Sequence, residues 1–348
     1  MTDNSGFNRR NLLKLGGLGG LALAGGSASL MKVTFAAEGK LLPVQVITSN
    51  STLTHALLDL LESQGYLKEL GVKQTFVHLN DNSKVVPALL SGEADLCILI
   101  GFSTAMPAVE KGVDLKVVGG AGLLAMDAVY TRVPEIKTVH DLEGRTVGTG
   151  AVGALTHQLM MALLEKYGVD TKKVKFRNIG SSSAIFRAVV AGTVDAGVGG
   201  INVYGEQKKY GVHVIKEGNL WTELPLYTFQ GAYTSGEAIK AKRETLVRTL
   251  AAFAKMFRFV QGPNSKDAFI KAYQKATGKN DVKAAAYQWE FIQKVRPYAV
   301  NLVLTSEQID FMQKLNLELG VQKKKLTFDQ IADMSLAHEA IKMIGGPV

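Results

Sequence analysis

Apolar and polar positions recur along the first hundred residues of the chain with two periods, one typical of β-strands and one typical of α-helices. The predicted elements are strands at 42–48, 74–79 and 95–100 and helices at 54–70 and 84–91. Gly71 and Gly92 are expected to end the two helices. Strands and helices in this order predict a mainly parallel sheet that helices cover on both faces.

A second passage, about a hundred residues further along, repeats this pattern with the same landmarks. Leu-Thr-His occurs at 53–55 and again at 155–157, and Ala-x-x-x-Gly-x-x-Asp occurs at 88–95 and again at 188–195. The second copy predicts strands at 146–149, 173–179 and 195–199 and helices at 155–167 and 184–191. A period this long corresponds to one folded unit and not to one turn of a solenoid. Two similar units predict two lobes with a cleft between them.

The chain is expected to cross between these lobes twice. Predicted strands at 115–119 and 128–132 complete the first lobe and enter the second. Nearly everything after Gly236 has the helical period, and we expect this region to pack on the first lobe. The predicted organisation is an export signal at 1–37, lobe one at 38–127 and 231–348, and lobe two at 128–230, with hinge crossings near 128–132 and 226–233.

The amino terminus has the composition of a targeting signal rather than of a folded element. A basic segment with the pair Arg9-Arg10 precedes a glycine-rich apolar stretch, and small residues follow up to Ala36-Ala37. This order is typical of an export signal, and paired arginines are typical of the twin-arginine route, which exports folded proteins. We therefore predict cleavage near Ala36-Ala37 and a mature protein in the periplasm.

Charge and cysteine content narrow the class of protein further. The net charge of +9 falls to +6 without the first 37 residues, because 36 basic and 30 acidic residues remain. These residues are interleaved, which favours solvated helix faces over a surface for nucleic acid. The single cysteine, Cys97, lies in an apolar run, so we predict a buried core thiol and no disulfide within the chain.

The loops after the predicted strands are the expected ligand sites, since open parallel sheets bind ligands beyond the carboxyl ends of their strands. In both copies these loops are rich in Gly, Ser, Thr and Asn and nearly free of Lys and Arg. Such residues at helix starts expose backbone N–H groups that suit an oxyanion or a carbonyl, although each also serves as a plain helix cap. The six loops together predict a small ligand that is either anionic or polar and neutral.

A glycine fingerprint keeps a cofactor open as an alternative. Residues 148–153 fit G-x-G-x-x-G between a predicted strand and a predicted helix. The acidic residue expected at the end of the next strand is absent, and Arg177 stands there, where an arginine suits a 2′-phosphate. The equivalent loop of the first copy has no glycine, and this favours a structural role for the fingerprint.

The sequence predicts neither a metal site nor a catalytic centre. His55 and His157 hold matching places in the two copies, but no second metal ligand accompanies either of them at a workable spacing. We interpret both as residues of the first helical turn, with hydrogen bonding to a ligand as the alternative. The serine loops show no G-x-S-x-G elbow with an attendant base.

With these features, and with the stretches at 88–95, 111–118 and 141–148, the chain resembles the nitrate/sulfonate/taurine group of ABC-transporter solute-binding proteins. That group also includes binders of thiamine-pyrimidine precursors. The resemblance covers residues 42–235 and implies a two-lobed periplasmic-binding-protein type II fold with a helical carboxyl-terminal region. It implies a monomer, without enzymatic activity or cofactor, that closes on a small-molecule solute and presents it to an ABC permease in the inner membrane.

The resemblance also indicates which residues contact the solute. The positions that match the ligand loops of the family are Asn50, Ser51, Thr52, Asn82, Phe102 and Ser103 in lobe one and Gly150, Ala151, Ser182 and Asn202 in lobe two. Two alternatives stay open from the residues themselves. One is an exported NADP-dependent oxidoreductase that uses the loop at 148–153, and the other is a solute sensor that docks to a receptor other than a permease.

Overall fold

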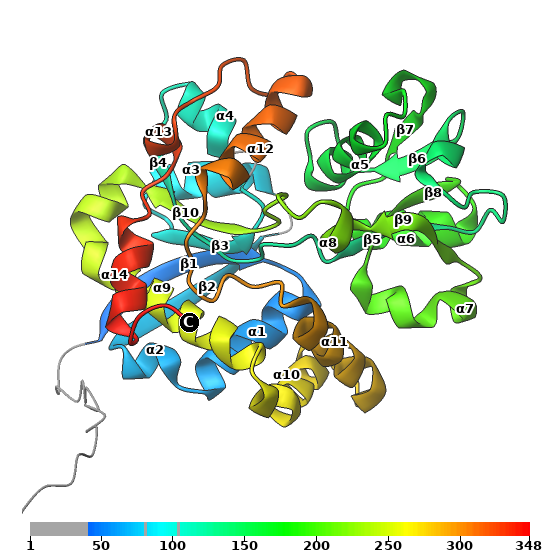
Figure 1. Cartoon of the computed structure of the whole chain (residues 1–348). Helices are drawn as coiled ribbons and strands as arrows, with labels where there is room; N and C mark the ends of the chain where they lie inside the picture. Colours follow the sequence, from blue (N-terminus) through cyan, green and yellow to red (C-terminus); the bar gives the residue numbers. More distant parts are fainter. Residues whose placement is uncertain (1–40, 80–81, 103–104) are drawn as a thin grey trace, which may run out of the picture. The chain divides into compact units, whose positions relative to one another are not determined.

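A computed structural model describes residues 41–79, 82–102 and 105–348 of the 348-residue chain. The predicted export signal at 1–37 and Ser103 lie outside the described residues, and Asn82 is described by its backbone alone. Strands and helices form two five-stranded sheets that helices flank (Figure 1). Among the helices of these ranges, none has the length and apolar character that crossing a membrane requires.

The first sheet has the strand order β2-β1-β3-β10-β4. Its strands are β1 (Leu42–Ser49), β2 (Val72–Leu79), β3 (Leu96–Ile100), β4 (Leu115–Gly120) and β10 (Gly231–Ser235). β1 runs parallel to β2 and β3, whereas β10 runs antiparallel to both of its neighbours. All five residues of β3 are buried, including Cys97, and burial raises the pKa of this free thiol far above its usual value. The predicted core thiol is therefore confirmed.

The second sheet repeats this topology with the order β7-β6-β8-β5-β9. Its strands are β5 (Asp127–Thr131), β6 (Thr146–Thr149), β7 (Lys175–Asn178), β8 (Ala196–Gly200) and β9 (His213–Asn219). Here the single antiparallel strand is β5, which enters from the first sheet, just as β10 is the strand by which the chain returns. The equal strand orders confirm the two copies that the sequence pattern predicts.

The repeated Gly-x-x-Asp landmark has the same structural role in each sheet. The Asp95 carboxylate accepts a hydrogen bond of 2.9 Å from the backbone N–H of Gln45, and the Asp195 carboxylate accepts one of 2.7 Å from that of Thr146. Each aspartate directly precedes a strand, β3 or β8, and thus ties the start of that strand to the neighbouring strand, β1 or β6. The landmark is architectural and does not form part of a ligand loop.

Helices alternate with the strands of both copies. They are α1 (Thr52–Ser63), α2 (Tyr66–Glu69), α3 (Val85–Leu90) and α4 (Ala105–Glu110), followed by α5 (Leu155–Lys166), α6 (Ser182–Ala191), α7 (Gln207–Tyr210) and α8 (Leu220–Glu223). The prediction of one helix at 54–70 is wrong. The chain forms α1 and α2 instead, because Gly65 adopts the left-handed conformation with φ 72° and interrupts the helix.

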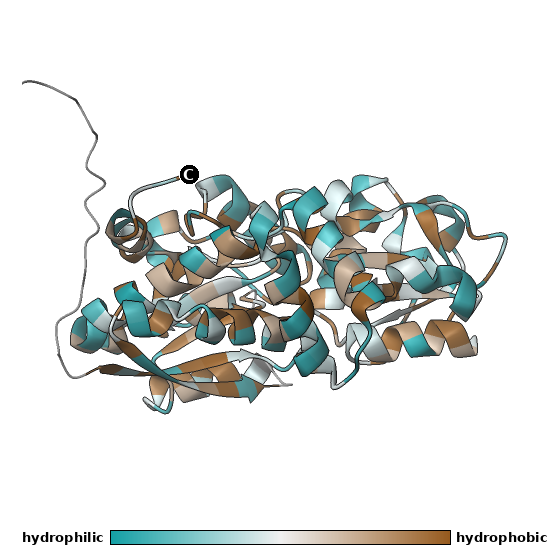
Figure 2. Cartoon of the chain, turned by 90° about the horizontal axis from the view of Figure 1, so that it is seen from below, coloured by the Kyte–Doolittle hydropathy of each residue, from teal (hydrophilic) through white to brown (hydrophobic). Residues whose placement is uncertain are grey.

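The predicted helical tail is present and contacts the first sheet as well as helical elements that flank the second. It comprises α9 (Gly236–Val260), α10 (Lys266–Thr277), α11 (Val282–Val295), α12 (Ser306–Glu318), α13 (Phe328–Ile331) and α14 (Ser335–Met343). As expected, α9 packs on β1 and α14, and α10 packs on α1. Figure 2 shows that apolar positions follow the strands, whereas hydrophilic positions gather on the helices that cover them. α11 also contacts the 3₁₀-helix after β8, and α12 is hydrogen-bonded to α5, and the sequence pattern did not indicate either contact.

Candidate functional site

The loop after β1 is organised by hydrogen bonds among its own side chains. Ser51 is the N-cap of α1, and its hydroxyl accepts a hydrogen bond of 3.1 Å from the backbone N–H of Thr54. A hydrogen bond of 2.7 Å joins Asn50 Oδ1 to His55 Nε2, and both Asn50 and Thr52 are exposed. Ser51 thus has the capping role that the sequence left open, while Asn50 and Thr52 keep a surface that a solute can contact.

His78 is a neighbour of this loop that sequence reasoning missed. It lies on β2 opposite Thr48, and a hydrogen bond of 2.9 Å joins Thr48 Oγ1 to His78 Nδ1. Its ring centroid is 4.3 Å from that of His55, and partial burial, with His55 as the smaller cause, lowers the pKa of His78. A histidine next to the end of a strand that pairs with β1 was the available signal. In the described ranges, no three His, Cys, Asp or Glu side chains form a group that could hold a metal ion.

Of the remaining predicted residues of the first lobe, Phe102 is buried in the core and Asn82 is described by its backbone alone. Phe102 is only 1% exposed and belongs to the hydrophobic core. A Cβ atom on Gly231 would lie 2.9 Å from its ring, so the ring packs directly on the backbone of β10. Phe102 therefore offers no apolar surface to a solute in this conformation. Asn82 begins a short 3₁₀-helix that precedes α3.

The glycine loop between β6 and α5 is closed by contacts within the protein. Gly150 is buried, and its backbone N–H donates a hydrogen bond of 2.7 Å to Thr156 Oγ1. The backbone N–H of Gly153 points to His157 Nδ1 at 3.5 Å. Gly153 has φ 79°, and a Cβ atom on it would lie 2.8 Å from Val321 Cγ1. A left-handed turn and a close approach therefore account for Gly153 without a dinucleotide.

The structure gives little support to a cofactor in this loop. A dinucleotide site uses free backbone N–H groups at the helix start, and those of Gly150 and Gly153 already have acceptors. Arg177 donates a hydrogen bond of 3.1 Å to the carbonyl of Thr193 in the turn after α6 and therefore does not stand free at the strand end.

Three predicted residues of the second sheet remain accessible. Ser181 caps α6 by accepting a hydrogen bond of 3.3 Å from the backbone N–H of Ala184, and Ser182 is the half-buried first residue of that helix. Ala151 and Asn202 are exposed on the loops after β6 and β8. These residues lie at the carboxyl ends of parallel strands, where the fold places ligand loops.

Asp127 is a second residue that sequence reasoning missed. It is the first residue of β5 and pairs with Gly200 at the end of β8. The residue is 4% exposed, and burial raises the pKa of its carboxyl to about 7. The signal in the sequence was a lone acid at the start of an otherwise apolar strand.

Two tail helices connect the loop edges of the two sheets. Gln158 on α5 donates a hydrogen bond of 2.7 Å to Asn316 on α12, and Gln288 on α11 donates one of 3.3 Å to the carbonyl of Ile201. Within the described residues, no hydrogen bond links the exposed loop after β1 to the loops of the second sheet. The predicted solute residues therefore form two separate groups, with α11 and α12 as bridges.

Two pockets in the described part of the chain are lined by other residues than the predicted solute residues, although Ser83 and Lys84 of the larger one directly follow Asn82. One of about 190 Å³ is lined by α5, α8 and α12 and their flanking residues, and one of about 670 Å³ is lined by β1, β2 and α3 with theirs.

The fold is that of the periplasmic binding proteins, which confirms the predicted fold class. The periplasmic aliphatic sulphonate binding protein SsuA of Escherichia coli matches with a TM-score of 0.69 and 19% identity, over 85% of this chain and 99% of that one. A family model described as NMT1/THI5 like matches residues 53–262, which is more than half of the chain. The chain belongs to the NMT1/THI5-like family, and the resemblance drawn from the sequence is confirmed at the level of family and fold.

Relatives of the chain include both a binding protein and an enzyme. YtlA of Bacillus subtilis (strain 168), whose name gives it a provisional binding role, is 23% identical over 312 residues, covering 87% of this chain and 91% of that protein. The 4-amino-5-hydroxymethyl-2-methylpyrimidine phosphate synthase of Aspergillus parasiticus is 28% identical over 160 residues, or 44% of each chain. The similarity to a binding protein thus spans nearly the whole chain, and the similarity to this enzyme spans less than half.

Proposed function

We propose that this chain is the periplasmic substrate-binding component of an ABC importer and captures a small organic anion or polar solute between its two lobes. The observation that supports this proposal most strongly is the pair of sheets with equal strand order. The loops at their edges are rich in Ser, Thr, Asn and Gly, and α11 and α12 bridge these edges. Similarity to SsuA, which binds aliphatic sulphonates, supports a solute of the sulfonate kind, and the resemblance drawn from the sequence adds taurine and nitrate as candidates.

The exposed and half-buried loop residues are the proposed solute contacts. Asn50 and Thr52 present polar side chains from lobe one, and Ala151, Ser182 and Asn202 present theirs, or their backbone, from lobe two. Each hydrogen bond contributes about 0.5–1.5 kcal/mol, so several of them with the two helix starts suffice for micromolar affinity, about −8 kcal/mol. Ser51 is exposed but its hydroxyl caps α1, and the buried Phe102 and Gly150 shape these loops from within.

Closure of the lobes is the proposed mechanism of capture. β5 and β10 are the antiparallel strands that carry the chain between the sheets, and they leave two crossing segments that can act as a hinge. A solute that contacts both lobes in the closed form and one lobe in the open form shifts the population toward closure. A monomer that closes in this way presents the loaded form to a permease.

A thermal-shift panel tests the proposal. Sulfonates, carboxylates, nitrate, pyrimidines and NADP would be added to the protein, because a ligand at 100 times its Kd stabilises by about 2.7 kcal/mol. We expect a rise in Tm with at least one small solute and none with NADP. A rise with NADP alone would contradict the receptor and favour the oxidoreductase.

Matched variants locate the site. Asn50→Ala and Ser182→Ala are expected to weaken binding of the solute that the panel identifies by about ten-fold each. Ser91→Ala removes an exposed hydroxyl whose hydrogen bond goes to Ala88 in its own helix, and it is expected to leave binding unchanged. If all three variants bind equally well, the solute site lies elsewhere.

A further inference from the structure

A groove of about 670 Å³ lies over the first sheet, beside α3. Its floor is formed by alternate residues of β1 and β2, and its wall is the face of α3 that carries Pro87 and Ala88. The floor residues are Gln45, Ile47, Val77 and Leu79. β1 rises by about 13 Å between Gln45 and Ser49, the residue opposite Leu79, so the groove has the length of about four residues of extended chain.

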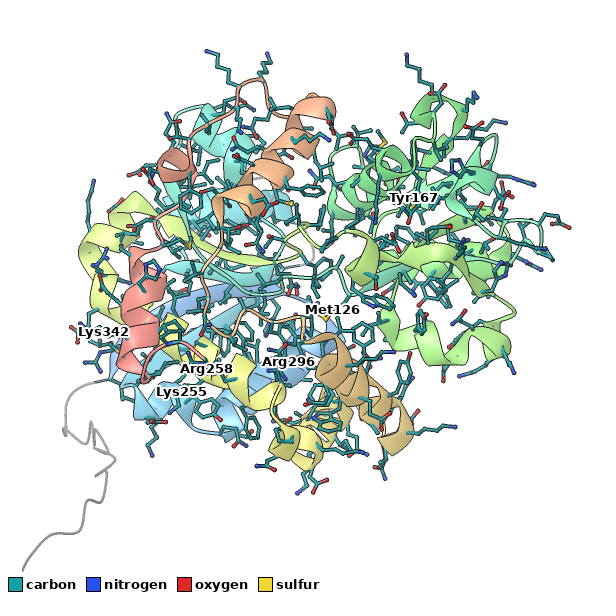
Figure 3. The ribbon with its side chains drawn as sticks, viewed as in Figure 1. Met126, Tyr167, Lys255, Arg258, Arg296 and Lys342 are labelled. Carbon is teal, nitrogen blue, oxygen red and sulfur yellow. The ribbon has the colours of Figure 1, made fainter. Side chains whose placement is uncertain are left out.

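The second copy has a position that corresponds to the outer side of this groove. The backbone N–H groups of Gln45 and Thr146 donate to the landmark aspartates of the two copies, so these two residues correspond. Two residues further along β1 and β6, the partners on the neighbouring edge strands are Val77 and Arg177. Figure 3 marks the second copy by Tyr167, which follows α5. Val77 and Arg177 therefore hold the same place in the two sheets.

Arg177 occupies this place in the second copy. Its guanidinium donates a hydrogen bond of 3.1 Å to the carbonyl of Thr193, so its side chain spans from the edge strand to the turn after α6. α6 also lies close on its sheet, because a Cβ atom on Gly148 would be 3.2 Å from Ile185 Cγ2. An arginine side chain and a closely packed helix thus stand where the first copy has a groove.

The first copy lacks both features. Val77 has no side-chain donor and is 37% exposed. Ile47 stands where the second copy has Gly148, so no close helix contact requires a glycine there. Glu93 stands where the second copy has Thr193, since each precedes its landmark aspartate by two residues. The groove is therefore open at the place that an arginine takes in the other copy, and an acid stands at the end that this arginine reaches.

Glu93 and Lys84 mark opposite ends of the groove. Glu93 precedes β3 at the end where the strands begin, and Lys84 ends the short 3₁₀-helix after β2 at the end where the strands finish. Both side chains are exposed, and within the described residues neither has an ion-pair partner. A cation toward Glu93 and an anion toward Lys84 would match these charges. A guanidinium suits the Glu93 carboxylate best, because the two form bidentate hydrogen bonds.

An extended peptide fits this groove better than a compact ligand does. Among the described strands, β2 lies at the edge of its sheet and pairs with β1 alone, so one side of its backbone is left for a further strand. A peptide that follows the strands directs every second side chain into the groove, in step with the alternating floor residues. Its other side chains stay in water.

We propose that this groove is a docking site for an extended peptide segment of another protein, in which an arginine lies along Val77 and reaches Glu93 and a carboxylate lies near Lys84. The arginine of the partner would take the place that Arg177 holds in the second copy. Its alkyl stem would pack on the exposed valine while its charged end meets the acid. This inference does not depend on the proposed solute cleft, whose residues are not among those that line the groove.

Calorimetry of the protein with the peptide N-acetyl-Arg-Ala-Val-Ala tests the inference. Two matched peptides are compared with it: one carries citrulline, a neutral isostere, in place of arginine, and one has an amide in place of the carboxyl-terminal carboxylate. We expect the citrulline peptide to bind about ten-fold more weakly, because hydrogen bonds between charged groups are the stronger ones. The amide should lose about three-fold, as exposed ion pairs are weak. Equal affinities for arginine and citrulline, or no binding by any of the peptides, would overturn the inference.

Variants assign the peptide to the groove. Glu93→Gln is expected to abolish the ten-fold difference between arginine and citrulline, whereas Glu135→Gln, at an exposed acid of lobe two that lines neither pocket, should keep it. Val77→Arg places in the first copy the residue that the second copy has, and it should weaken peptide binding about ten-fold or more. Val282→Arg adds the same charge at another exposed valine and should leave binding unchanged. A difference that survives Glu93→Gln, or full binding by Val77→Arg, would overturn the inference.

A last comparison separates a peptide from a free guanidino compound. N-acetyl-arginine amide carries the same side chain without the rest of the tetrapeptide. We expect it to bind about five-fold more weakly or worse, because it makes neither the strand contacts nor the contact with Lys84. An affinity equal to that of the tetrapeptide would overturn the assignment of a peptide as the occupant.

Discussion

The side-chain amide of Gln158 donates a hydrogen bond of 2.7 Å to the side-chain oxygen of Asn316, and both residues are fully buried. The other atom of the same amide, Gln158 Oε1, accepts the hydroxyl proton of Tyr227 at 3.0 Å. One amide thereby joins α5, α12 and the segment that returns to the first sheet. A buried polar junction at this position holds lobe two against the tail helix beside the proposed hinge.

Removing the Gln158 amide is expected to lower the free energy of unfolding by more than its own hydrogen bonds contribute. Gln158→Leu leaves the buried Tyr227 hydroxyl without its acceptor and should lower the free energy of unfolding by about 2–4 kcal/mol. Tyr227→Phe should cost about 1 kcal/mol, and the double variant less than the two together, because the orphaned hydroxyl is then absent. Urea denaturation measures all three, and strict additivity would contradict the junction.

Alanine variants of two glycines with left-handed backbones distinguish the cost of backbone strain from the cost of a close contact. Gly153→Ala and Gly168→Ala both place a Cβ at positive φ, 79° and 66°, and each should cost about 1–2 kcal/mol for that reason. Only Gly153 faces a close neighbour, Val321 at 2.8 Å, so its variant should lose about 1–3 kcal/mol more. Equal losses of unfolding free energy for the two variants, measured by thermal unfolding, would mean that Gly153 is not packed closely against Val321.

The paired aspartates of the repeat should differ in their contributions to stability. Asp95 is 5% exposed and holds both the Gln45 N–H and Lys242, whereas Asp195 is half-buried and holds the Thr146 N–H alone. Asp95→Ala is therefore expected to lower the free energy of unfolding by about 3 kcal/mol and Asp195→Ala by about 1–2 kcal/mol. The reverse order in denaturant titrations would refute this assignment.

Asp127 makes stability depend on pH even without a solute. Its pKa is 3.8 in the unfolded chain and about 7 when folded, so the folded protein keeps a proton that the unfolded chain releases. This contribution is fully present below about pH 3.8 and is lost as pH rises through about 7. Wild type should lose about 1.4 kcal/mol per pH unit relative to Asp127→Asn across this window. A constant difference in urea titrations between about pH 5 and about pH 8 would contradict the burial of an unpaired carboxyl.

The repeat in the sequence predicts the fold well, because a strand period of two and a helix period of 3.6 are local properties. Equal landmarks in both copies also predict equal strand orders, and capping by Ser51 and Ser181 follows from short-range chemistry. The roles of residues that depend on partners far along the chain are harder to predict from the sequence. Phe102 is core only because Gly231, far along the chain, packs on its ring, and His78 joins the loop only through the pairing of β1 with β2.

Asp127 and the bridging helices show the same limit. The start of β5 reads as an apolar strand with one acid, and nothing local indicates that Gly200 lies opposite or that no donor faces the carboxylate. The amphipathic pattern of α11 and α12 predicts a buried face but not the second sheet as its partner. These contacts join residues far apart in the chain, and the local hydrophobic period of one sequence does not indicate which distant segments pair.

Isothermal titration calorimetry of the protein with the small solute that gives the largest thermal shift tests the central claim most directly. The account predicts one site per chain with a Kd of about micromolar order. It also predicts a loss of about ten-fold or more in affinity when Asn50→Ala from lobe one or Ser182→Ala from lobe two is introduced, and no heat with NADP. Binding of NADP in place of every small solute, or binding that depends on residues of one lobe alone, would contradict capture between two lobes.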